Sequence, residues 1–164
     1  MNTSLQLNRR QLLIFASCSI VAGPLMASAG VDTIDIHVVK NPQCGCCNAW
    51  IETLREEGFT VSSEDRSGSL LAMFKVESGI PGSMMSCHTA KTGGYFIEGH
   101  VPAREIKRLI RDSPDALGLA VPAMPHGSPG MGPEEERDAY DVFIISLDGT
   151  AEVFQHYPKA GIPI

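Results

Sequence analysis

The chain has 164 residues, and its 13 Lys and Arg residues against 19 Asp and Glu give a formal net charge of −6. Residues 1–29 hold two arginines and no acids, so the remainder has 11 basic and 19 acidic residues, a net charge of −8. This balance argues against nucleic acid or an anionic membrane surface as a partner, because both attract basic proteins.

Residues 1–29 have the pattern of a cleaved export signal. Arg9 and Arg10 precede an apolar run at 12–26, which ends in the small-residue site Ala27-Ser28-Ala29. Gly23-Pro24 interrupts the run, which therefore falls short of the roughly 20 clean apolar residues that span a bilayer. We expect the segment to direct export and then to be removed.

Two export routes fit this segment. The Sec route needs only the features just described, while adjacent arginines directly before the apolar run leave the twin-arginine route open. Acylation of Cys18, as in a lipoprotein, is the less favoured alternative. The mature chain, residues 30–164, would then enter an oxidising compartment with four of the five cysteines of the full sequence.

The mature chain begins with a strand that leads directly into the cysteines. Residues 34–40 are β-branched and alternating, and Asn41-Pro42 ends them. Cys47, Trp50, Ile51 and Leu54 then have the spacing of a helix that buries one face, with a stop at Gly58. Later patterns predict, in order, a strand at 59–65, a helix at 70–79, a hairpin of 84–91 with 95–99, and a helix at 101–114.

The resulting order is β-α-β-α-β-β-α with a C-x-x-C pair at the start of the first helix, which predicts an α/β domain of the thioredoxin-like type. Residues 113–139 are rich in Gly, Pro and Met and lack periodicity, so we expect a loop there. Residues 140–157 read as two strands across the turn Asp148-Gly149, a hairpin that should extend the sheet. One domain over 30–164, with a core at about 34–112, is expected.

The stretch "CGCC" at 44–47 carries the first chemical signal. Unpaired N–H groups at a helix N-terminus stabilise a thiolate, so Cys44 should have a lowered pKa. Cys44 as nucleophile and Cys47 as resolving thiol would make a redox pair, the basis of a thiol-disulfide oxidoreductase. A simple structural disulfide is the less favoured alternative.

Cys46 favours a different reading of the same stretch. In a two-thiol redox site a third adjacent thiol promotes scrambling, because any thiolate can attack a neighbouring disulfide. In a metal site extra thiolates are useful, since they bridge ions and favour Cu(I), Zn(II) or an iron–sulfur cluster. Cys87 falls in the predicted hairpin that a thioredoxin-like arrangement sets opposite the first helix, so four sulfurs should converge.

Methionine and histidine donors tip the choice of metal toward copper, because a thioether binds Cu(I) better than zinc. We expect His88, next to Cys87, to ligate or to support a ligand, and we hold ligand and filler roles about equal for Met124 and Met131 in the loop. His126 stays open in the same way. Met84 or Met85 is expected in the core with Trp50, whereas ordinary surface or capping roles are expected for His37, His100 and His156.

In these residues the chain resembles the exported CopG-like copper-resistance proteins, long catalogued as a domain of unknown function. The resemblance rests on "CGCC", "SCHTA", "GGYFIEGHVPAREI", "DALGLAVPAMPHGSPGM" and "YDVFIISLDG", and covers roughly 34–157. It implies a thioredoxin-like protein of the Gram-negative periplasm in which Cys44, Cys46, Cys47 and Cys87 bind a cluster of copper ions. Met and His neighbours are assigned less securely, and storage, transfer and redox interconversion of Cu(I) and Cu(II) stay open.

The sequence departs from ordinary thioredoxins at the hairpin. Those enzymes have a cis-proline facing the C-x-x-C, whereas this chain has Cys87 in that neighbourhood and Pro81 several residues earlier. The hypothesis is therefore a periplasmic protein holding one or more Cu(I) ions, redox-active as a secondary possibility, with copper ions and a copper efflux or chaperone protein as partners. A thiol-disulfide oxidoreductase and a structural zinc module are the alternatives.

Overall fold

The computed structural model describes residues 33–163. The predicted export signal, with Cys18, lies outside the described residues. Twelve elements follow one another in the order β1 (Ile34–Lys40), α1 (Gly45–Glu56), β2 (Phe59–Asp65), α2 (Ser69–Glu77), the short 3₁₀ turn Gly82–Met84, β3 (His88–Thr92), β4 (Tyr95–Glu98), α3 (Ala103–Asp112), β5 (Ala116–Ala120), a second 3₁₀ turn at Glu134–Glu136, β6 (Tyr140–Ser146) and β7 (Ala151–Tyr157).

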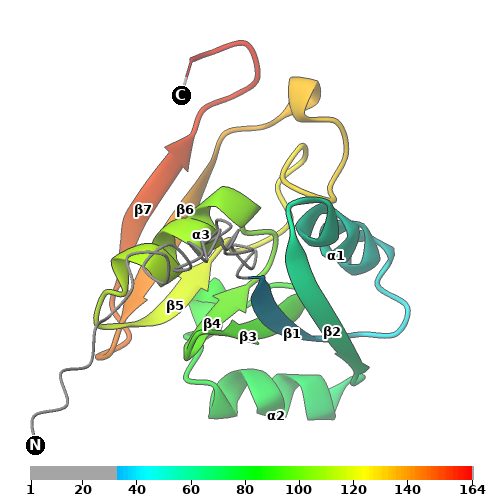
Figure 1. Ribbon diagram of the computed structural model, residues 1–164, viewed down its shortest axis with the longest axis vertical. Helices are drawn as coiled ribbons and strands as arrows, with labels where there is room; N and C mark the ends of the chain where they lie inside the picture. The colour runs from blue at the N-terminus through cyan, green and yellow to red at the C-terminus, as the bar shows by residue number, and fades with distance from the viewer. Residues whose placement is uncertain (1–32, 164) are drawn as a thin grey trace, which may run out of the picture. The chain divides into compact units, whose positions relative to one another are not determined.

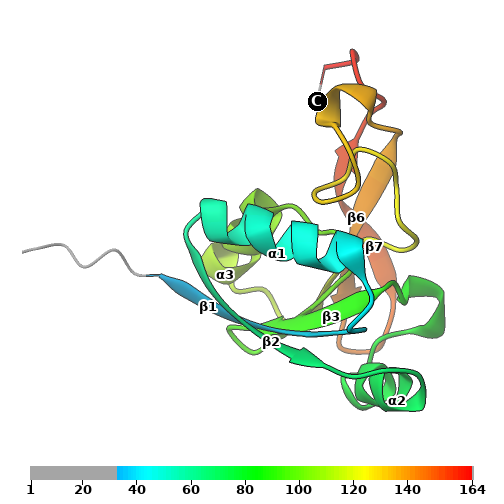
Figure 2. The same cartoon turned by 90° about the vertical axis from the view of Figure 1, so that its right-hand side faces the viewer.

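The strands form one mixed sheet of seven in the order β2-β1-β3-β4-β5-β6-β7 (Figure 1). β1 runs parallel to β2 and antiparallel to β3, and β4 runs parallel to β5. Helices α1 and α3 lie on one face of the sheet and α2 on the other (Figure 2). The predicted α/β class and the predicted order of the first seven elements are therefore confirmed.

The main core lies between the sheet and the helices α1 and α3. Trp50 and Leu54 of α1 and Ile106 and Leu109 of α3 are fully buried there with the inner faces of the strands. These are the positions that the 3.6-residue period assigned to buried helix faces. A smaller cluster on the opposite face contains Phe96 and Ile145, with Met84 and Met85 packed against it, which confirms the interpretation of these methionines as core filler.

The prediction of a loop over 113–139 is wrong at the start of that range, because residues 116–120 form strand β5 in the middle of the sheet. The segment "ALGLA" has little strand propensity of its own. Its pairing is tertiary: β5 lies between β4 and β6, and a Cβ on Gly118 would stand 1.9 Å from the carbonyl oxygen of Phe96. Only a glycine lets the two backbones approach so closely.

One boundary near the cysteines also differs from prediction. The hairpin begins at His88 rather than at Met84, so Cys87 stands just before β3 and outside the ladder. The C-terminal hairpin is present as predicted and extends the sheet through β6. Among the described helices none is both long and apolar enough to cross a bilayer.

Candidate metal centre

The cysteine run begins helix α1. Cys44 is the residue that precedes its first turn, and Cys46 and Cys47 lie within that turn. Cys44 and Cys47 form a disulfide, and Cys46 is free. In this oxidised state neither sulfur of the pair titrates, so the lowered pKa expected of Cys44 applies to the reduced form.

Sulfur atoms from two distant segments meet beside this turn. The Sγ atom of Cys46 lies 3.4 Å from that of Cys44, and the Sγ atoms of Cys44, Cys46, Cys47 and Cys87 all lie within 4.8 Å of one another. The expected convergence of the four sulfurs is therefore present. Thiolates at such separations can bridge soft metal ions.

The sheet explains why Cys87 reaches the helix. In the β1–β3 ladder His88 pairs with Lys40, the last residue of β1, and the chain runs from there into the cysteine run. The residue before His88 must therefore lie close to the start of α1. Ser86 fixes the approach, because its backbone N–H donates to the Glu98 carboxylate and its hydroxyl donates to the carbonyl of Ala123 at 2.6 Å.

Two buried histidines complete the surroundings of Cys87. Its Sγ atom lies 3.2 Å from Nδ1 of His88 and 3.2 Å from Nε2 of His100. Nδ1 of His100 donates to the carbonyl of Pro129 at 2.8 Å, so in the neutral ring the lone pair is on Nε2 and faces Cys87. Cys87, His88 and His100 thus form a second compact donor set that shares one sulfur with the first.

Burial decides the protonation of this second set. Burial lowers the pKa of both imidazoles. The pKa of His88 lies well below its ordinary value, and the nearby His100 is a further cause of that shift. Burial, and then the charge of Cys46, raise the pKa of the Cys87 thiol to about 12. Without metal the site therefore presents two neutral imidazoles and a protonated thiol at neutral pH.

His88 has one further property. Its ring packs on Trp50 with the ring centroids 4.3 Å apart, and its Nε2 atom is buried without a hydrogen-bond partner among the described residues. The ring is therefore held by packing and by the Cys87 contact. His88 lies beside the cysteine cluster, as predicted.

The loop after β5 covers the start of α1. A Cβ on Gly130 would stand 2.6 Å from the backbone nitrogen of Trp50 and 3.0 Å from the carbonyl oxygen of Cys46, which shows how closely the loop packs there. Met131 is half-buried in the same loop, and its backbone bonds to Gly127 and Ser128. Met124 is 52% exposed.

His126, which the sequence left open, lies with its Nε2 atom 3.2 Å from the Glu136 carboxylate on the surface. His100 is the functional candidate that the sequence reading missed, since a surface or capping role was expected for it. The turn Gly93-Gly94 carried the signal: Thr89 pairs with Glu98 across the hairpin, so counting its register sets position 88 close to positions 99 and 100.

The chain is similar to proteins of known structure. Residues 84–131 match the family model described as a protein of unknown function, DUF411, and no curated protein matches. Two solved structures, described as copper resistance protein CopG in form 1 and form 2, are each 42% identical and cover 77% of this chain. The match covers 98% and 99% of those chains, with TM-scores of 0.72 and 0.71, so this protein belongs to the CopG family of copper resistance proteins.

Proposed function

We propose that this protein binds copper in the periplasm as part of copper resistance, holding Cu(I) between the sulfurs of Cys44, Cys46, Cys47 and Cys87. The observation that carries the proposal is the meeting of these four sulfurs, from segments forty residues apart, within 4.8 Å. Cysteine sulfur is the donor that Cu(I) prefers in proteins. Family membership supports the choice of copper over zinc.

The disulfide relates copper loading to redox state. The Cys44–Cys47 bond must accept two electrons before both sulfurs can act as thiolates. In the opposite direction, the Cys44 and Cys47 thiolates release two electrons as they form the disulfide, and two Cu(II) ions accept them and become Cu(I). We propose this exchange as the redox activity of the site, with storage and transfer as its alternatives.

The nitrogen donors suit the oxidised ion. His88 and His100 stand 3.2 Å from the Cys87 sulfur, and a set of two imidazoles and one thiolate serves both copper states in electron-transfer proteins. We propose both histidines as copper ligands beside Cys87, and Met131 and Met124 as soft donors from the covering loop. The efflux or chaperone protein that exchanges copper with this site would approach through that loop.

The proposed scaffold is thioredoxin-like. The strand order β2-β1-β3-β4 with α1 and α3 on one face and α2 on the other supports it (Figure 2). The C-terminal strands β5–β7 then form an addition to that core. Export by the leader at 1–29 would bring the domain to the periplasm.

The test is metal analysis of the reduced, mature protein under anaerobic conditions. We expect more than one Cu(I) per chain, and Cys46→Ser or Cys87→Ser should each lose most of the copper while unfolding at nearly the wild-type temperature. Ser62→Ala, on the exposed strand β2, is the control. Full copper loading in both cysteine variants would disprove the proposal.

A thiol-disulfide oxidoreductase is the second candidate, favoured by the disulfide at the start of α1. It needs Cys44 and Cys47 but neither Cys46 nor Cys87. Disulfide exchange with a small reporter disulfide should therefore persist in Cys46→Ser and Cys87→Ser. Loss of exchange in these variants would exclude this candidate.

A further inference from the structure

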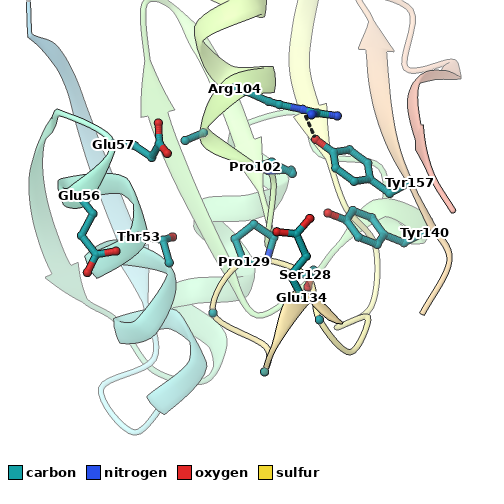
Figure 3. A pocket seen from close by; sticks show the side chains of 14 residues that line it. Thr53, Glu56, Glu57, Pro102, Arg104, Ser128, Pro129, Glu134, Tyr140 and Tyr157 are labelled. Carbon is teal, nitrogen blue, oxygen red and sulfur yellow. Dashed lines mark hydrogen bonds between the residues drawn. The ribbon is translucent and has the colours of Figure 1, made fainter. Parts of the chain in front are cut away.

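The loop after β5 lines a cavity of about 450 Å³. Its walls come from the end of α1, the start of α3, the loop at 127–134, and the side chains of Tyr140 and Tyr157 (Figure 3). The volume is in the range of about 300–1,000 Å³ typical of small-ligand sites. Nothing in the copper chemistry described above uses it.

Tyr140 is the feature that points to a ligand. Its side chain is only 7% exposed, and its hydroxyl points into the cavity without a hydrogen-bond partner among the described residues (Figure 3). Tyr157 stacks on it with ring centroids 4.7 Å apart, but the hydroxyl of Tyr157 is occupied, since it donates to Glu105 and accepts from Arg104. The Tyr140 oxygen is open to the cavity, because it is not among the buried unpaired side-chain atoms, and it can therefore accept a hydrogen bond from an incoming group.

The charges around the cavity indicate the sign of that group. Glu56, Glu57 and Glu134 line it, and Arg104 is the one basic side chain among its lining residues. Arg104 is already committed, because it pairs with Glu105 at 2.8 Å and lies over the Tyr157 ring. Glu57 pairs with Lys107 and Glu134 with Arg137, while Glu56 has no ion pair among the described residues.

We propose that this cavity binds an alkylguanidinium or alkylammonium group, such as an arginine or lysine side chain of a protein partner or a free amine. An N–H of the cation donates to the Tyr140 oxygen, and the carboxylate of Glu56 balances its charge, while Glu134 offers as a further acceptor its Oε2 atom, since Arg137 bonds to Oε1. The aromatic pair forms the apolar wall against which the alkyl part packs.

The position of the cavity gives the binding a consequence for the metal centre. Pro129 and Gly130 line the cavity, yet the carbonyl of Pro129 bonds to His100 and Gly130 packs against Cys46 and Trp50. A partner bound in the cavity would contact the loop that also contacts His100 and Cys46, two of the proposed copper ligands. This connection rests on the proposed function, whereas the binding of the cation does not.

The test is an NMR titration of the metal-free, oxidised protein, so its outcome is independent of copper. The probes are n-butylguanidinium, n-butylammonium and the matched anion butyrate, together with the blocked peptide acetyl-Gly-Arg-Gly-amide. We expect the cations to shift the amide signals of Gly127 and Gly130 and the ring signals of Tyr140, and butyrate to leave them unchanged. Binding of the free cations identifies a small-molecule site, and binding of the peptide alone identifies a side-chain site; each supports the proposal.

The variants separate binding from folding. Tyr140→Phe keeps the ring stack and should weaken the cation about threefold to tenfold, as for loss of one hydrogen bond. Glu56→Gln with Glu134→Gln should weaken it further, while Tyr95→Phe and Glu135→Gln, outside the cavity, should bind as the wild type does. Shifts produced by butyrate, absence of shifts with every cation, or equal binding by Tyr140→Phe would overturn the proposal.

Discussion

At the scale of single residues, Cys87 is the point at which the two donor sets meet. Its sulfur belongs to the cluster with Cys44, Cys46 and Cys47 and also to the set with His88 and His100. The sequence predicted the group of four cysteines because the spacing of Cys44, Cys46 and Cys47 is visible in a motif and the order of the elements sets Cys87 opposite them. It did not predict His100, because that contact depends on how far the β3–β4 hairpin extends.

The raised pKa of Cys87 predicts a slow, strongly pH-dependent reaction with alkylating agents. In oxidised Cys46→Ser, where Cys87 is the one free thiol within residues 33–163, burial remains to raise its pKa. The alkylation rate should still climb about tenfold per pH unit at pH 9–10, whereas an unfolded thiol levels off above about pH 8.5. Labelling with iodoacetamide, quenched at a series of times, measures the alkylation rate. A rate that levels off near pH 8.5 in the folded protein would contradict a raised pKa of Cys87.

His100 should matter for the oxidised ion more than for the reduced one. His100→Phe keeps a buried ring but removes the nitrogen that faces Cys87. We expect Cu(I) bound by the sulfurs to stay within about threefold of the wild-type amount, and Cu(II) signals in electron paramagnetic resonance to fall by more than half, as for loss of one ligand nitrogen. His156→Phe, at the surface beside Asp141, is the control. Unchanged Cu(II) signals would remove His100 from the proposed ligands.

At the scale of elements, a buried polar network supports the segment that carries Cys87. Lys75 of α2 donates to the Glu98 carboxylate and, at 2.9 Å, to Thr89, and Thr89 donates to Glu98 at 2.6 Å. The same carboxylate receives the Ser86 N–H. Burial raises the pKa of Glu98 and Lys75 opposes that shift. α2 is therefore joined to the metal centre through one carboxylate.

Removing that carboxylate should be costly. Glu98→Ala leaves the Lys75 ammonium buried and unpaired, which typically costs about 3–5 kcal/mol. Lys75→Met with Glu98→Gln removes both charges and should recover most of the loss. Urea unfolding measures the free energies, and Glu98→Ala within 1 kcal/mol of the wild type, on the scale of about one surface ion pair, would refute the structural role.

The covering loop can be tested at Gly130. Gly130→Ala and Gly149→Ala introduce the same side chain at positive φ values of +80° and +84°, but only at Gly130 would the Cβ meet other atoms. Each should lose about 1 kcal/mol or more from backbone strain. Gly130→Ala should in addition lower copper affinity, because the loop must move off Cys46 and Trp50. Equal copper affinity in the two variants would show that the loop is not part of the site.

At the scale of the whole domain, the sequence predicts the elements that have local patterns, and it fails where a strand forms only through pairing with distant segments. Strands β1, β2 and β3 and helices α1 and α3 follow from alternation, helical period and turn residues, and the structure contains them. β5 does not, because "ALGLA" carries no pattern and becomes a strand only between β4 and β6. The proposed copper site is intermediate: Cys44, Cys46 and Cys47 form a local motif, and their meeting with Cys87 follows from the order of the elements.

The domain as a whole should be more stable with copper, and much more so when the Cys44–Cys47 disulfide is reduced. A ligand that binds the folded state alone stabilises it by about 4 kcal/mol at a thousand times its dissociation constant. Reduced protein given Cu(I) should therefore melt several degrees higher, whereas oxidised protein, with Cys44 and Cys47 paired, should gain much less. Calorimetry under nitrogen compares the two. Equal gains in both states would mean that the disulfide sulfurs take no part in holding the ion.

The burial of Cys87 also bears on how long the protein would survive in the oxidising compartment proposed for it. Peroxides attack thiolates rather than thiols, and overoxidation to the sulfinic state is irreversible for almost every protein. A sulfur kept protonated up to a pKa of about 12 is shielded from that damage while the site waits for its ion. The sulfur that both donor sets share is thus held in its chemically inert form, and binding of the proposed metal would displace its proton.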